Sequence, residues 1–206
     1  SGASLAYEHV WIPLRHLAKT EQRSVCKLSR LAAIRDTYSN DSLEWDDACI
    51  QTEAIAFFPS EHFIHDHKAE IYPNEEFIGK LIVERNASYI KSATDNYYSF
   101  LFEGKSFAII PGHKIISDAS EVFRKIGISV TLSFAYKVTS YGNVELRISA
   151  RSDGSFDCNK FASNYGGGGH IKAAGGITIP VTENSKNPYS SIIEIINQHG
   201  KDCFLS

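Results

Sequence analysis

A run of glycines that ends in a histidine is the strongest chemical signal in this sequence of 206 residues. Six of the fourteen glycines fall between Gly166 and Gly176, in the string GGGGHIKAAGG. Ordering a glycine costs up to about 1 kcal/mol more than ordering an alanine, so such a run indicates a backbone that needs positive φ or a close approach. Consecutive amides in a glycine loop can bind an anion, and His170 can donate to a phosphate oxygen. A helix that begins at His170 would add its dipole, so the string predicts a phosphate site.

An alternative stays open for this string. It can be a flexible loop that ends a helix at Tyr165, with His170 as an incidental polar residue. The spacing differs from the dinucleotide motif GxGxxG and lacks the GK[ST] of the P-loop, so neither nucleotide motif applies. Three nearby aromatic residues, Phe156, Phe161 and Tyr165, can stack on a base, although the helical spacing of Phe161 and Tyr165 favours the core.

A longer string carries a family resemblance. Residues 151–176, RSDGSFDCNKFASNYGGGGHIKAAGG, resemble the signature of the DHH-associated C-terminal domain: an Arg-Ser pair, a short helix entered through Asp157, and then GGGH-x-x-AAG. The resemblance implies that this domain holds a substrate's phosphate and nucleotide, facing a metal site across a cleft. It implies phosphate contacts from Gly167, Gly168, Gly169 and a catalytic His170, and a second anion contact from Arg151. An exposed arginine at a strand end is the alternative for Arg151.

The front of the chain resembles the same superfamily more weakly. SGASLAYEHVW is similar to the helix that follows the metal-binding DHH motif, and LAAIRDTYSNDSLEW to the stretch with the last metal-binding aspartate, at Asp36. The resemblance implies Mn²⁺ or Mg²⁺, which need several oxygen or histidine ligands. Two such ions can clamp the attacking water and the leaving oxygen. The remaining ligands are expected upstream of Ser1. Asp36 as an ordinary carboxylate at a helix end stays open.

A second group of possible ligands lies in a polar stretch between the two halves. His62, His65 and His67 stand beside Glu61 and Glu70, a composition that can bind a transition metal. No strand is predicted before them, and a solvated linker helix is the favoured interpretation.

The elements that must position these residues change type along the chain. Apolar spacing predicts helices first, and hairpins around Gly104 and Gly142 indicate a sheet in the second half. The fold class is therefore α/β in the α+β arrangement. Helices are expected over 2–17, 24–34, 43–57, 76–91, 118–126 with Ser117 as cap, 157–165 and 189–199; strands are expected over 98–102, 106–110, 129–136, 144–150 and 176–181.

The resemblance also assigns domains to these elements. It implies the C-terminal helical part of a DHH phosphoesterase domain over 1–58, a linker and connector helix over 59–95, and the DHH-associated substrate-binding domain over 96–206.

Composition and charge narrow the class of protein. The net charge of −3 argues against a protein held on duplex DNA by a basic face. Residues 1–80 carry 8 Lys and Arg against 13 Asp and Glu, whereas residues 81–206 carry 13 against 11, which suits a cation-binding first half and an anion-binding second half. No apolar run is long enough for a membrane helix, and no secretory signal begins the chain, so a cytoplasmic protein without a membrane partner is expected.

These observations lead to a functional hypothesis. The chain is expected to be part of a metal-dependent phosphoesterase that hydrolyses phosphodiester bonds in short RNA, DNA or small nucleotides. The 206 residues alone are expected to bind without turning over. Two alternatives are an RNA-binding module similar to the C-terminal domain of alanyl-tRNA synthetases and a polyphosphatase of the same superfamily. The residues do not indicate an oligomeric state.

Overall fold

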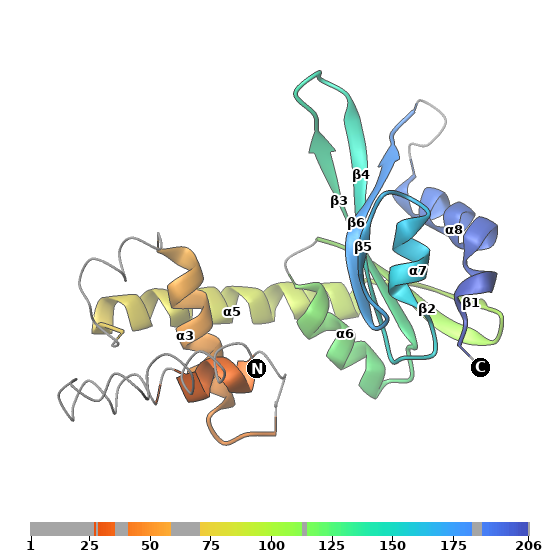
Figure 1. Ribbon diagram of the computed structural model, residues 1–206. Coiled ribbons are helices and arrows are strands. Elements are labelled where there is room, and N and C mark those ends of the chain that lie inside the picture. Colours follow the sequence, from red (N-terminus) through yellow and green to blue (C-terminus); the bar gives the residue numbers. More distant parts are fainter. Residues whose placement is uncertain are drawn as a thin grey trace, which may run out of the picture. The chain divides into compact units, whose positions relative to one another are not determined.

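The computed structural model in Figure 1 describes residues 27, 29–35, 41–58, 71–112, 115–182 and 187–205. The chain divides into two compact units, Ser1–Ala87 and Ser88–Ser206, and the division falls within the long helix α5 (Pro73–Asp95). Asp36, the histidine group at 62–67 and the predicted helix over 2–17 lie outside the described residues. None of the described helices combines the length and apolarity that a membrane crossing requires.

The first unit is helical where it is described. Residues 29–35 are helical, and α3 spans Trp45–Phe57, which confirms two of the predicted helices. A Cβ atom at Gly79 of α5 would lie 2.4 Å from the carbonyl oxygen of Ile50 in α3. A glycine at this position therefore lets the backbones of α3 and α5 approach closely.

The second unit is a six-stranded mixed sheet with helices on both faces, which confirms the α+β class. Its strands lie in the order β1-β2-β3-β4-β6-β5. Only β2 and β3 are parallel, and α6 connects them; all other neighbours are antiparallel. The elements are β1 (Tyr98–Phe102), β2 (Lys105–Pro111), α6 (Ile116–Lys125), β3 (Val130–Val138), β4 (Val144–Ser152), α7 (Cys158–Ser163), β5 (Gly168–His170), β6 (Ala173–Pro180), α8 (Pro188–His199) and a 3₁₀ turn (Lys201–Cys203).

The two faces of this sheet are covered differently. Helices α7 and α8 pack on one face, where the larger core contains Phe107, Ile148 and Ile177 at zero exposure. On the other face α6 covers β3 and part of β4, and the end of α5 contributes Ala93 to a smaller core around Phe123. Figure 1 shows α6 on the side of the sheet opposite α7 and α8. The alternation of side chains along each strand therefore assigns every sheet residue to one of two layers.

Local turn chemistry explains both predicted hairpins. The β1–β2 turn places Glu103 and Gly104 at φ values of 49° and 74°, as a two-residue hairpin loop requires. The second hairpin, β3–β4, turns at Gly142 (φ 81°), and its outer end extends beyond the helices (Figure 1).

Candidate functional site

Helix α7 leads into the glycine run, and its start is the one expected from the sequence. The Asp157 carboxylate accepts from the backbone N–H of Lys160 at 2.9 Å, which is the N-cap bond that an aspartate supplies. The helix ends before Gly166, whose φ of 74° favours glycine. The short helix predicted after Asp157 is confirmed.

The glycine run then forms an edge hairpin, so the expectation of a helix at His170 is wrong. Strand β5 pairs antiparallel with β6, with His170 opposite Ala173, and the predicted last strand begins at Ala173 rather than Gly176. The two-residue turn between the strands, Ile171–Lys172, is held by the rest of the unit. Its carbonyl groups accept from the backbone N–H of Cys158 (2.7 Å) and of Ser152 (3.0 Å).

Close backbone packing explains why glycines are needed in this hairpin. A Cβ atom at Gly167 would lie 2.3 Å from the Gly175 carbonyl oxygen, and one at Gly169 would lie 2.4 Å from the Ala173 carbonyl oxygen. Gly168 is different, because its nearest neighbour would be Asn159 Oδ1 at an ordinary 3.7 Å. Packing therefore requires glycine at 167 and 169, whereas nothing in the described chain requires it at 168.

Two amides of the run already have partners inside the protein. The Gly167 N–H donates to the Ala162 carbonyl at 3.0 Å, and the Gly169 N–H donates to Asn159 Oδ1 at 2.9 Å. These two amides stabilise the hairpin against α7. Sequence reasoning missed Asn159, since nothing in its spacing from Gly169 indicates that bond. These two amides are therefore not available to a ligand.

Strand pairing brings Arg151 and His170 into one row. Thr131, Arg151, Ala173 and His170 are consecutive partners across β3, β4, β6 and β5. Paired residues project to the same face, so Arg151 and His170 share the face that carries α6, two strand spacings or about 10 Å apart. Ala173 between them is small and only half-buried. Arg151 and His170 therefore lie on either side of the small Ala173 side chain.

Arg151 is half-buried and has neutral partners only. Its Nε and Nη2 donate to Ser117 Oγ at 3.3 and 3.2 Å, and its Nη1 donates to the Ala150 carbonyl at 2.9 Å. It forms no ion pair with any described residue. Desolvation by burial lowers the pKa of the Arg151 guanidinium below its ordinary value. An anion at this position would offset that electrostatic cost.

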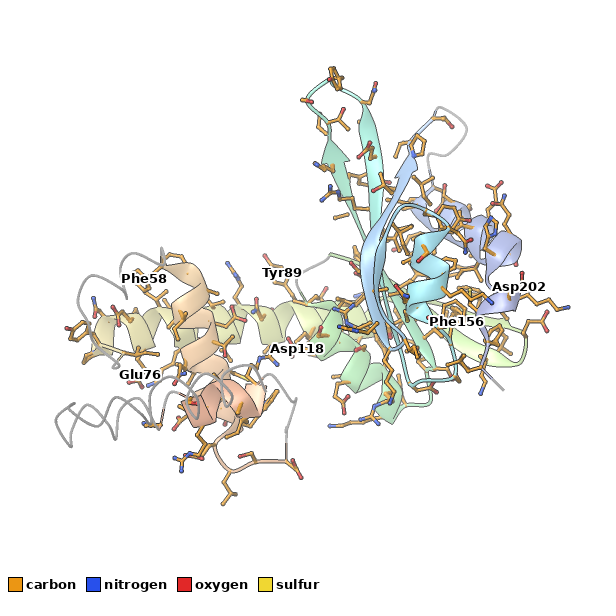
Figure 2. All side chains as sticks on the ribbon, in the orientation of Figure 1. Phe58, Glu76, Tyr89, Asp118, Phe156 and Asp202 are labelled. Carbon is orange, nitrogen blue, oxygen red and sulfur yellow. The ribbon has the colours of Figure 1, made fainter. Side chains whose placement is uncertain are left out.

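The start of α6 adds to the positive potential at Arg151. Ser117 lies inside the first turn of α6 and accepts from Arg151, so the expectation that it caps the helix is wrong. The true N-cap is Ile115, which has no side-chain cap bond. A guanidinium beside the positive end of a helix dipole is unfavourable unless an anion joins it. Asp118 is the acidic residue in this first turn of α6. Figure 2 labels Asp118 on α6 and Phe156 on the α7 side of the sheet.

His170 is exposed at the sheet edge. Its side chain forms no hydrogen bond or ion pair with the described residues, which leaves both ring nitrogens accessible. By contrast, the aromatic residues near the run are structural: Phe156 and Phe161 are fully buried, and the Tyr165 hydroxyl donates to the Ile195 carbonyl at 3.4 Å. The core interpretation is confirmed for Phe161, and Phe156 is as inaccessible to a base.

The described residues do not fit a divalent metal. No three His, Cys, Asp or Glu side chains within the described ranges come together as a ligand group. Asp36, the one predicted ligand in this sequence, lies outside those ranges. The site described above is therefore a candidate anion site, and no step through a metal is derived from it.

Comparisons with known proteins give structural matches only. No family model and no curated protein matches the sequence. One similar structure is a pGpG-specific phosphodiesterase, PggH, from Vibrio cholerae, with 13% identity over 63% of this chain and a TM-score of 0.40. Another is an uncharacterized protein from Helicobacter pylori, with 17% identity over 84% of this chain and a TM-score of 0.36. A third is an exopolyphosphatase-related protein from Bacteroides fragilis, with 14% identity over 76% of this chain and a TM-score of 0.35. The chain spans 44%, 54% and 51% of these three proteins' lengths, in that order.

Proposed function

We propose that residues 88–206 bind the phosphate group of a nucleotide or short oligonucleotide, as the substrate-binding part of a DHH-type phosphoesterase. The observation that carries this proposal is the position of Arg151: half-buried, without an ion pair among the described residues, and beside the positive end of α6. His170 lies in the same row of the sheet on the same face. The resemblance of residues 151–176 to the DHH-associated domain supports the same role.

The two side chains have different tasks in this proposal. Arg151 presents a guanidinium already oriented by Ser117, so it can donate to phosphate oxygens without much loss of side-chain entropy. His170 donates one further hydrogen bond from the sheet edge, to an oxygen on which negative charge develops. Gly168 allows the ligand to approach the backbone of β5. Metal-dependent hydrolysis remains a proposal from the resemblance alone, through Mn²⁺ or Mg²⁺ and ligands that the described residues do not supply.

Calorimetric titration of the 206-residue chain with AMP and with the dinucleotide pApA tests this proposal. We expect Arg151→Ala to weaken the binding of both ligands by about 1.5–3 kcal/mol and His170→Ala by about 1–3 kcal/mol, the range for a hydrogen bond to a charged group. Lys125→Ala, which removes an exposed cation at the far end of α6, is the matched control and should leave both affinities unchanged.

Two results would contradict the proposal. Unchanged affinity in both Arg151→Ala and His170→Ala would make this row of the sheet structural. Tight binding of tRNA without affinity for AMP or pApA would instead favour an RNA-binding module. An unchanged melting temperature in each variant shows that the loss concerns the ligand and not the fold.

A further inference from the structure

A second arginine lies on the same face of β4 as Arg151. Leu146, Ile148 and Ala150 are buried in the core with α7 and α8. The residues between and beside them therefore project from the opposite face, where Arg151 contacts α6. Arg147 is one of these residues, so Arg147, Ser149 and Arg151 form a line along the strand.

Arg147 has no partner that would explain its position. It is exposed, and its side chain forms no hydrogen bond or ion pair with the described residues, whereas Lys80, Lys91 and Arg124 each pair with a carboxylate on their own helix. Its neighbours in the sheet are the small Ala135 and Thr178. The nearest acidic residue on this face of β4, Glu145, lies directly opposite Lys137. The local charge around Arg147 is therefore positive.

The floor between the two arginines is small and uncharged. Ser149 lies midway, opposite Ser133 on β3, and a Cβ atom at Gly175 on β6 would lie 3.1 Å from Ser149 Oγ. The hydroxyl of Ser133 is fully buried and has no hydrogen-bond partner in the described chain, which is unusual for a buried polar group. The floor therefore consists of small buried and half-buried side chains and backbone, and it carries no cation.

The separation of the two arginines limits what can bridge them. Four residues of a strand span about 13 Å between Cα atoms, and the bonds to Ser117 and to the Ala150 carbonyl hold the Arg151 guanidinium in place. A ligand with two phosphate groups separated by a spacer can contact both arginines without drawing their side chains together. A chain of directly linked phosphates would place negative charge over the uncharged floor, whereas a nucleoside would not.

We propose that Arg147 is a second phosphate contact and that this face takes ligands of at least two nucleotides in preference to mononucleotides. The first phosphate is held at Arg151 and His170, the nucleoside lies across Ser149 and Gly175, and the next phosphate reaches Arg147. This inference rests on the proposed function, because it extends the Arg151 site along β4.

Calorimetry with AMP, pApA and tripolyphosphate tests the inference on the full chain. We expect Arg147→Ala to weaken pApA binding about three- to tenfold, the range between an exposed ion pair and a charged hydrogen bond, and to change AMP binding less than twofold. The slope of log K against log salt for pApA should fall by about 0.7, as expected for one lost phosphate contact on a single strand. Arg147→Lys should retain most of the pApA affinity, and Lys125→Ala should retain all of it.

The outcomes separate the two proposals. If Arg151→Ala weakens both nucleotides but Arg147→Ala weakens neither, the second contact is wrong and the proposed function stands. If Arg147→Ala weakens the binding of AMP and of pApA equally, the preference for ligands of two or more nucleotides is wrong. If tripolyphosphate binds more tightly than pApA and its affinity depends on Arg147 to the same extent, the placement of a nucleoside between the two phosphate contacts is wrong. If neither Arg151→Ala nor His170→Ala has an effect, or the unaltered chain binds neither nucleotide, both proposals fail.

Discussion

The two faces of the C-terminal sheet use the same strands for opposite purposes. On the face toward α7 and α8, β4 places Leu146, Ile148 and Ala150 in a closed apolar core. On the other face the same strand carries Arg151, which contacts α6, and Arg147, which is exposed. A strand that alternates in this way separates stability from binding residue by residue. Substitutions on the two faces should therefore fail in different assays.

The largest expected effect lies on the covered face. Phe161→Ala removes a fully buried ring that contacts Phe156 at 5.6 Å between centroids and Tyr165 at 5.8 Å. It should lower the free energy of unfolding by about 3–5 kcal/mol, as large-to-small core substitutions do. Denaturant titration measures this loss. A loss below about 1 kcal/mol would mean that this face is not the stabilising core.

A pair of neighbouring glycines sharpens the comparison at the edge of the sheet. Gly167→Ala forces a Cβ against the Gly175 carbonyl and should cost about 1–3 kcal/mol of stability, the overpacking range. Gly168→Ala has room for its methyl group, so its stability should change by less than about 1 kcal/mol. The same Gly168→Ala should weaken pApA binding if the ligand approaches this backbone. Equal destabilisation by both alanines would remove the distinction between a packing glycine and a ligand glycine.

The smallest effect concerns the burial of Cys158 in the core with α7 and α8. It is measured as the pH dependence of the free energy of unfolding. Burial raises the pKa of the Cys158 thiol from 9.0 to about 11. A pKa raised in the folded state stabilises the fold below the unfolded pKa, and this contribution is lost as pH rises from about 9 to 11. Between pH 8 and pH 10 the native chain should lose roughly 1 kcal/mol more stability than Cys158→Ala does.

Local patterns predicted much of this fold because local chemistry determines the elements concerned. The Asp157 cap, the Gly104 turn and the alternation along β4 are each decided within a few residues. One wrong expectation concerns a contact between distant residues. Ser117 accepts from Arg151, 34 positions away, instead of capping its helix.

The sequence predicted which residues belong to the candidate site but not the backbone structure that positions them. Arg151, Gly168 and His170 can be selected from the sequence, yet the glycine run suggested a loop followed by a helix, whereas close approach across a hairpin decides its shape. That approach follows from the pairing of β5 with β6. The strand order β4-β6-β5, which no short pattern contains, brings this hairpin next to the strand of Arg151. The same order places Arg147 beside the site, and its significance follows only from the register of the strands.

The short turn at Ile171–Lys172 has a consequence for the thermodynamics of binding. Its two carbonyl groups accept from the backbone N–H groups of Cys158 and of Ser152, the residue directly after Arg151. The β5–β6 hairpin that carries His170 is therefore hydrogen-bonded to the strand that carries Arg151. The two anion contacts therefore belong to one rigid piece of backbone. A ligand that binds there does not have to draw two separate segments together, and it avoids most of the entropy loss that ordering a loop adds to association.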